Sequence, residues 1–331
     1  METRKVQQTG GSTYIISLPK QWADKVGIVT GSRVSLAPQP DGTLLIDPIH
    51  GSSTPKRKTI DVSDIKGDAL TRDTIAAYLA GYDIIELTSN RFSSGQKKII
   101  REICYKLIGP EIIEETAKSV VIQDLLNQNE ISIKKSVRRM FLIANSMHKD
   151  AIIALKNSDT DLALDVIQRD DDVDRLFLLT AKQFRSILRG ARVPDISEIS
   201  IDEYHDLRMT TGPLERIADH AQKIAKVAHS MQDVIPEAVM ELTEKASEAS
   251  RKIVDDSIDA LYSSNAVLAN QVIGNIDEMH SMITELNESL LTLDSREMVI
   301  AMRTIADSID RIGDYGANIA EIAINSAMAG K

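Results

Sequence analysis

The chain has 331 residues, enough for two or three domains, and its single cysteine, Cys104, excludes an internal disulfide framework and a cysteine-based zinc site. It is 43% apolar but only 4% aromatic, a composition typical of helices packed through aliphatic side chains. No apolar run approaches the roughly 18 residues of a membrane span, and the polar N-terminal residues do not resemble a signal peptide. We therefore expect a cytoplasmic protein without membrane insertion.

Charge is distributed unevenly along the chain. Residues 1–58 contain eight Lys or Arg side chains and four Asp or Glu side chains, a net charge of +4. The whole chain carries −10, so the remainder carries −14. A basic head on an acidic body predicts different partners at the two ends.

The head, residues 1–50, is predicted to be a small β domain. Short strands are expected over 6–11 and 14–18, and a brief helix over 20–26 begins after Pro19. A hairpin is expected over 33–37 and 43–47, around the turn Pro40-Asp41-Gly42. So few large apolar side chains cannot form a stable core alone. We therefore expect an obligate dimer that interleaves strands from two copies.

Several motifs of the head resemble the AbrB/SpoVT/MazE family. They are Arg4-Lys5-Val6, Gly11-Ser12-Thr13, Ile16-Ser17-Leu18-Pro19-Lys20, Val26-Gly27-Ile28, Thr30-Gly31-Ser32 and Asp41-Gly42-Thr43-Leu44-Leu45. The resemblance implies a swapped-hairpin homodimer that binds DNA. Phosphate contacts are expected from Arg4, Lys5, Lys20 and Arg33. The alternative is a dimerisation module whose cations are merely exposed.

Residues 51–126 are predicted to form a linker and a small α+β unit. The polar stretch 51–58 reads as a linker. Helices are expected over about 68–80 and 95–108, the second stopped by Gly109-Pro110. A strand is expected over 83–87, and extended stretches include 112–113 and 120–122. No nucleophile, phosphate loop or ligand cluster occurs in this unit, so its role stays open.

Helical periodicity dominates from residue 127 onward. Six long helices are expected, and polar or Gly/Pro breaks separate them. Their approximate ranges are 129–156, 159–189 (ended by Gly190 and Pro194), 200–231, 236–263, 266–293 and 295 to the end. They form two sets of three, over 127–232 and 233–331, which predicts an all-α body built by duplication.

The duplication is clearest in one repeated acidic motif. Residues 214–221 read Leu-Glu-Arg-Ile-Ala-Asp-His-Ala, and residues 309–316 read Ile-Asp-Arg-Ile-Gly-Asp-Tyr-Gly. Each copy sets two carboxylates four residues apart, Glu215 with Asp219 and Asp310 with Asp314, away from the apolar stripe of its helix. Adjacent like charges repel, and a bound cation would offset that repulsion. The alternative is a solvated face softened by the neighbouring arginines.

A further acidic pair, Asp170 and Asp174, lies four residues apart on the second helix of the body. If this helix packs beside the third, four carboxylates could supply one metal site. Ligation by oxygen alone suits Mg²⁺, Mn²⁺, Ca²⁺ or an iron cluster. Alignment of the two repeats places His280 opposite Asp174, and whether His280 is a ligand stays open. We therefore expect the first site to be the more complete one.

The body resembles the PhoU family of phosphate-uptake regulators. The residues that carry the resemblance are Val166-Ile167 with Asp170 to Asp174, Asp206-Leu207-Arg208, 214–220 and 310–321. It implies two three-helix bundles, with multinuclear metal sites built from E/D-x-x-x-D motifs. Carried over to this chain, the ligands would be Asp170, Asp174, Glu215, Asp219, Asp310 and Asp314. The family's role is to restrain the high-affinity phosphate transporter and its signalling kinase when phosphate is plentiful.

Three functions are therefore considered. The first is a dimeric, phosphate-responsive regulator that binds DNA through its head and metal through its body, with a transporter ATPase subunit or a signalling kinase as a further partner. The second is a carboxylate-bridged metalloenzyme, which needs inward-facing Glu and Glu-x-x-His pairs. The third is a scaffold that binds no metal. The first hypothesis accounts for most of the motifs, and we therefore expect that the protein is not an enzyme.

Overall fold

The structure, a computed structural model, describes residues 2–38, 42–48, 55–126, 131–188, 199–231 and 233–329. The chain divides into two compact units, residues 1–55 and residues 56–331. Some expected features lie outside the described residues: the turn at Pro40-Asp41, linker residues 51–54, the helix start near Asn129, and the helix end at Gly190 and Pro194.

The described residues of the first unit form two small antiparallel sheets and one short helix. β1 (Gln7–Thr9) pairs with β2 (Thr13–Ile15), α1 (Lys20–Lys25) follows, and β3 (Val34–Pro38) pairs with β4 (Leu44–Pro48). None of its described side chains is fully buried. Large apolar side chains are instead exposed: Val6, Tyr14, Ile15, Ile16, Val29, Leu36, Leu44 and Leu45. The expected lack of a self-contained core is confirmed.

The second unit begins with a four-stranded sheet and two helices. In chain order these are β5 (Arg57–Asp61), α2 (Asp68–Leu79), β6 (Ile84–Thr88), α3 (Ser94–Tyr105), β7 (Pro110–Glu115) and β8 (Ser119–Asp124). The strand order is β5-β6-β8-β7, and only β5 and β6 run parallel. The helices bury Leu70, Tyr78 and Ile100 with the strand residues Ile85 and Leu87 in one small core. We call residues 56–126 the α/β module.

The prediction of a linker over 51–58 is wrong for its last two residues. Arg57 and Lys58 begin β5 and pair in parallel register with Ile84 and Ile85. The strand lies at an edge of the sheet, so most of its side chains are exposed and its sequence is polar. Local composition therefore suggested a linker, although backbone pairing with β6 makes it a strand.

The α/β module docks on the body through a buried ion pair. The Lys182 ammonium from α5 contacts the Asp124 carboxylate at the end of β8, and both side chains are at most 5% exposed. The same ammonium lies 4.2 Å from the ring centroid of Tyr78. Leu178, one turn earlier on α5, packs against the core of the module. Because a buried charge is costly without its partner, these contacts hold the module on α5.

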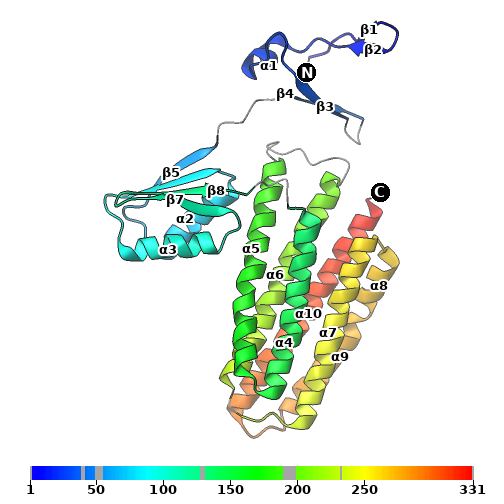
Figure 1. Ribbon diagram of the computed structural model, residues 1–331. Coiled ribbons are helices and arrows are strands. Elements are labelled where there is room, and N and C mark those ends of the chain that lie inside the picture. The colour runs from blue at the N-terminus through cyan, green and yellow to red at the C-terminus, as the bar shows by residue number, and fades with distance from the viewer. Residues whose placement is uncertain are drawn as a thin grey trace. The chain divides into compact units, whose positions relative to one another are not determined.

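The described part of the body contains seven helices. Figure 1 shows them packed beside one another. They are α4 (Ile133–Asn157), α5 (Thr160–Leu188), α6 (Ile201–Ser230), α7 (Glu237–Ser263), α8 (Ala266–Gly274), α9 (Ile276–Leu290) and α10 (Arg296–Met328). The first three pack on one another, as do the last four, and α6 contacts α10 between the two sets. Within the described ranges, no helix combines the length and apolar character needed to cross a membrane.

The two sets share a connection with the same backbone geometry. Ser158 after α4 and Ser264 after α7 both adopt left-handed conformations, with φ of 52° and 51°. In each case the next residue caps the following helix, because the Asp159 and Asn265 side chains accept from the backbone N–H groups of Leu162 and Leu268. This equivalence supports an origin by duplication.

The fifth expected helix is broken, which corrects the expectation of six continuous helices. α8 ends at Gly274, and α9 begins at Ile276. The backbone N–H of Asn275 bonds to the carbonyls of both Gln271 and Val272, which tightens the last turn of α8. Gly and Asn are weak helix formers, and this explains the position of the break.

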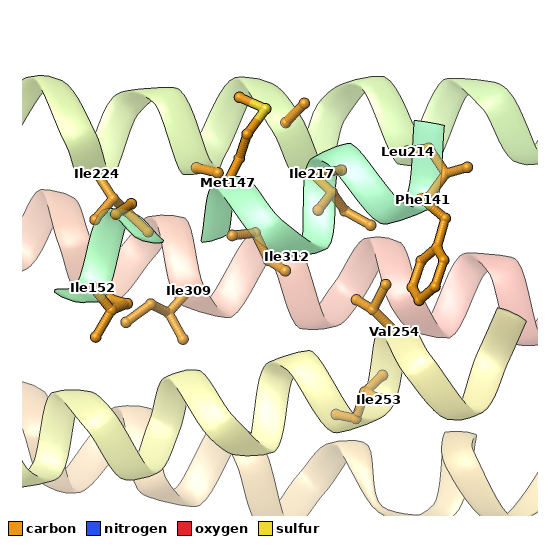
Figure 2. Close-up of a cluster of buried hydrophobic side chains, with 14 of the residues drawn as sticks. Phe141, Met147, Ile152, Leu214, Ile217, Ile224, Ile253, Val254, Ile309 and Ile312 are labelled. Carbon is orange, nitrogen blue, oxygen red and sulfur yellow. The ribbon is translucent and has the colours of Figure 1, made fainter. Parts of the chain in front are cut away.

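A continuous hydrophobic core joins the two repeats. Figure 2 shows buried side chains from α4, α6, α7 and α10 in one cluster, including Phe141, Leu214, Val254 and Ile312. The apolar stripe predicted for α6 is confirmed, since Leu214, Ile217, Ala221, Ile224 and Ala228 are at most 4% exposed. This packing fixes which faces of α6 and α10 remain for the acidic motifs.

Candidate metal centres

The first acidic motif lies along the contact between α5 and α6. These helices pack together as expected, and the Gln222 side-chain amide on α6 donates to the Ile167 carbonyl on α5 at 3.1 Å. Asp170 and Asp174 come from α5, and Glu215 and Asp219 come from α6. All four are partly buried rather than fully outward-facing. We call these four carboxylates the acidic seam.

The carboxylates of the acidic seam repel one another, and burial together with this repulsion raises the pKa of three of them. Burial raises the pKa of Asp170 to about 7, and the charges of Asp174 and Asp219 add to the rise. The pKa of Asp174 is raised by burial and then by Asp219, and Glu215 responds in the same way. Each raised pKa indicates a carboxylate whose negative charge is not neutralised by nearby cations. A group of carboxylate oxygens in this state suits a hard cation such as Mg²⁺ or Ca²⁺.

One arginine partly compensates the acidic seam. The Nε atom of Arg216 lies 3.4 Å from Glu215 Oε2, and its Nη1 lies 3.3 Å from Asp219 Oδ2. The Arg216 side chain is 57% exposed, so water screens these pairs. No three of the four carboxylates offer oxygens within 4.8 Å of one another. The acidic seam is therefore an open arrangement.

The second acidic motif is more tightly assembled and includes the histidine. His280 Nε2 on α9 lies 3.1 Å from Asp314 Oδ1 and 3.5 Å from Asp310 Oδ1, both on α10. Within the described ranges, this is the only group of three metal-ligating side chains whose ligand atoms all lie within 4.8 Å. The tighter convergence thus lies at the second motif, although the sequence favoured the first as more complete.

One buried oxygen at the second motif lacks a hydrogen bond within the described part of the chain. Asp310 Oδ1 is buried and accepts no hydrogen bond from the described residues. Burial raises the pKa of Asp310, and the nearby His280 opposes that rise. Arg311 contacts the other carboxylate, with Nη1 3.4 Å from Asp314 Oδ2. An unsatisfied buried oxygen beside an imidazole fits a bound cation.

The α/β module contacts α5 beside the acidic seam, which the sequence did not indicate. Lys106 Nζ, just after α3, lies 3.5 Å from Asp171 Oδ1 on α5, and the Arg175 guanidinium lies 5.5 Å from the Tyr105 ring. Lys106 also lowers the pKa of Asp174. Both contacts join segments more than 60 residues apart, so no local pattern could have revealed them.

The candidate DNA-binding cations lie at separate places in the first unit. Arg4 and Lys5 precede β1, Lys20 opens α1, and Arg33 directly precedes β3. The Arg4 guanidinium contacts the Glu2 carboxylate. A single copy of this unit thus distributes its cations over its length.

The repeats of the body match a known family. A family model of the PhoU domain covers residues 137–228 and 243–323, just over half of the chain. The chain belongs to the PhoU family. PhoU proteins are regulatory accessory proteins rather than enzymes, in agreement with the sequence.

Similar proteins carry the same family name. The chain is 27% identical over 195 residues to the phosphate-specific transport system accessory protein PhoU of Escherichia coli, covering 57% of this chain and 80% of that protein. It is 26% identical over 181 residues to a PhoU homologue of Zymomonas mobilis, covering 53% of this chain and 74% of that protein.

Solved PhoU structures share the fold of the body. The crystal structure of PhoU from Pseudomonas aeruginosa covers 62% of this chain and 99% of that chain, with a TM-score of 0.54 and 23% identity. PhoU from Streptococcus pneumoniae covers 60% of this chain and 94% of that chain, with a TM-score of 0.52 and 18% identity. The head is similar to another family, since a model of the bacterial antitoxin MazE matches residues 7–60.

Proposed function

We propose that this protein is a cytoplasmic regulator that restrains phosphate uptake when phosphate is plentiful. The observation that carries the proposal is the PhoU match over both helical repeats. The relative in Escherichia coli is named an accessory protein of phosphate-specific transport. A transporter ATPase subunit or a signalling kinase is the partner that this role requires.

Deletion of the gene tests this role directly. We expect cells without the protein to take up phosphate at a high rate even in phosphate-rich medium, and the full chain supplied in trans to restore the low rate. The measurement is the initial uptake of radiolabelled phosphate after growth in rich and poor medium. Uptake that stays normally regulated in the deletion strain would contradict the proposal.

We propose that the head gives this regulator a second output by binding DNA as a homodimer. The similarity to MazE, the +4 charge of residues 1–58 and the exposed apolar side chains support this. Two copies would double the cations available for phosphate contacts from Arg4, Lys5, Lys20 and Arg33.

Footprinting upstream of phosphate-transport genes tests the DNA-binding output. We expect protection at low salt and a steep fall of affinity with rising salt, because binding to phosphates releases counterions. Replacing Lys20 and Arg33 by Ala should weaken binding and flatten the salt dependence. Replacing the exposed Lys98 on α3, which lies outside the head, is the matched control. A head that ignores duplex DNA at low salt would serve dimerisation only.

We propose that the body binds metal ions at its two acidic motifs. Asp170, Asp174, Glu215 and Asp219 would hold one site, and Asp310 with Asp314 the other. The raised pKa of Asp170 and the buried Oδ1 of Asp310, which accepts no hydrogen bond from the described residues, support a demand for positive charge. Iron, Mn²⁺, Mg²⁺ and Ca²⁺ are all compatible with carboxylate ligands. Metal analysis of the purified protein and of a variant carrying Glu215→Ala and Asp219→Ala is the test. Equal metal content in the two proteins would exclude the first site, and no metal in either would leave a scaffold.

A further inference from the structure

The imidazole of His280 makes the second acidic motif chemically different from the acidic seam. Its Nε2 faces Oδ1 of both Asp310 and Asp314, at 3.5 and 3.1 Å. The acidic seam contains only carboxylate oxygens. Because alignment of the repeats sets His280 opposite Asp174, one nitrogen ligand stands where the first repeat has an oxygen ligand.

Close packing between α9 and α10 positions this imidazole. Met279, which is 1% exposed, packs on Gly313, and a Cβ at Gly313 would lie 2.6 Å from the Met279 methyl carbon. Gly313 directly precedes Asp314 on α10 and lies within one turn of Asp310. The close approach therefore brings the next residue of α9, His280, to the two carboxylates.

The remaining contacts of the two carboxylates, among the residues that the structure describes, leave one buried oxygen without a hydrogen bond. Arg311 approaches Oδ2 of Asp314, so Oδ1 of that residue faces the imidazole. Asp310 Oδ1 accepts no hydrogen bond from the described residues although it is buried. A cation between the three ligand atoms would satisfy this oxygen and bind the imidazole nitrogen at the same time.

We propose that the two repeats hold different classes of metal ion, and that His280 is the ligand that determines the difference. The second motif takes a borderline divalent transition metal, such as Co²⁺, Ni²⁺, Zn²⁺ or Fe²⁺, through one nitrogen and two carboxylates. The acidic seam takes a harder cation, such as Mg²⁺ or Mn²⁺, through oxygens alone. Imidazole favours the borderline ions, whereas carboxylates suit the harder ones. This inference rests on the proposed metal binding and specifies its chemistry.

Calorimetric titrations with Co²⁺ and with Mn²⁺ test the proposal on the full chain. His280→Asp makes the second motif resemble the first, and we expect its Co²⁺ affinity to fall at least about tenfold, the loss that even outer-shell substitutions cause. Mn²⁺ affinity at the acidic seam should stay within about twofold, because the substitution leaves that site unchanged, and Mn²⁺ binding gained by the altered second motif appears as a separate equivalent. His205→Asp is the matched control, because His205 also lies on a body helix beside a carboxylate, with its Nδ1 3.6 Å from an Asp206 oxygen, but outside both acidic motifs.

Two further measurements separate the possible failures. The variant with Glu215→Ala and Asp219→Ala should lose Mn²⁺ binding and keep Co²⁺ binding. In the unmodified protein, one equivalent of Zn²⁺ should shift the ¹⁵N resonance of a single imidazole Nε2, which requires no substitution. If metals bind but His280→Asp keeps the original Co²⁺ affinity, His280 forms only an ion pair and this inference fails alone. If neither metal binds, the proposed metal function fails with it.

Discussion

Asp170 occupies an electrostatically unfavourable position on α5. Its pKa rises from an ordinary 3.8 to about 7 because it is partly buried beside Asp174 and Asp219. Between these two pH values the folded protein holds a proton that the unfolded chain has released. The free energy of unfolding therefore decreases as the pH rises from about 4 to 7, and stays reduced above 7.

Replacing the Asp170 carboxyl by an amide should remove this loss of stability at high pH. We expect Asp170→Asn to raise the free energy of unfolding at pH 8 by about 1 kcal/mol, after allowance for the screening of a half-exposed group. At pH 4 the variant and the unmodified protein should be alike. Urea unfolding in the presence of a chelator, followed by helical circular dichroism, measures both values.

Asp172→Asn is the matched control for this measurement. Asp172 lies two residues away on the same helix, its side chain is 51% exposed, and it contacts Arg175 at 3.8 Å. Its substitution should change stability by less than about 0.5 kcal/mol. An Asp170→Asn variant no more stable than this control at pH 8 would show that the acidic seam carries little repulsion.

At the scale of the helices, α10 approaches α7 closely at Gly316. A Cβ at this position would lie 2.8 Å from Ile253 Cγ2 and 3.1 Å from the backbone nitrogen of Val254. The Ser257 hydroxyl on α7 also donates to the Gly316 carbonyl at 2.7 Å. Backbone atoms cannot move aside as a flexible side chain can, so the two helices depend on the absence of a side chain here.

An alanine at Gly316 should push α7 and α10 apart. We expect Gly316→Ala to lower the free energy of unfolding by about 1–3 kcal/mol, the usual cost of overpacking. Gly212→Ala on α6 is the control, because a Cβ there meets no atom within 4 Å. Removing a helical glycine should stabilise this second variant by up to about 1 kcal/mol. Chemical unfolding measures both variants. Equal changes in their free energies of unfolding would contradict the close approach at Gly316.

The helices were predictable from sequence, whereas several details depended on tertiary contacts. Periodicity and caps predicted α4 to α7 and α10, because caps such as Asp159 are local signals. Strand β5 was missed because its pairing partner lies 27 residues away. The acidic residues of the motifs were visible as a repeat. The 3.1 Å approach of His280 to Asp314 required the packing of Met279 on Gly313, which no spacing encodes.

At the scale of the molecule, the first unit cannot stabilise itself as a single copy. Its described side chains include none that is fully buried, and Leu36 on β3 is 58% exposed. Burial of apolar area is the main source of folding free energy. A second copy of the same unit is therefore the expected cover for these side chains.

A charge on β3 tests this expectation in the full chain. We expect the unmodified protein to sediment as a dimer and Leu36→Lys to shift it toward the monomer, because the ammonium would be buried between copies. Ser35→Lys is the control, since side chains of successive strand residues point to opposite faces. Sedimentation velocity measures both variants. If Leu36→Lys remains as dimeric as Ser35→Lys, the exposed face of β3 is not the contact between copies.

The break between α8 and α9 separates two tasks that a continuous helix would have to perform together. α8 buries Ala269 and Val272 against the body, and α9 carries His280 toward α10. Inserting or deleting one residue at Asn275 would rotate everything beyond it by about 100° if the helix were continuous. Since the helix is already interrupted there, such a change in α9 would leave the packing of α8 in place. The break at Asn275 thus allows the ligands of the second repeat to differ from those of the first while the packing of α8 is kept.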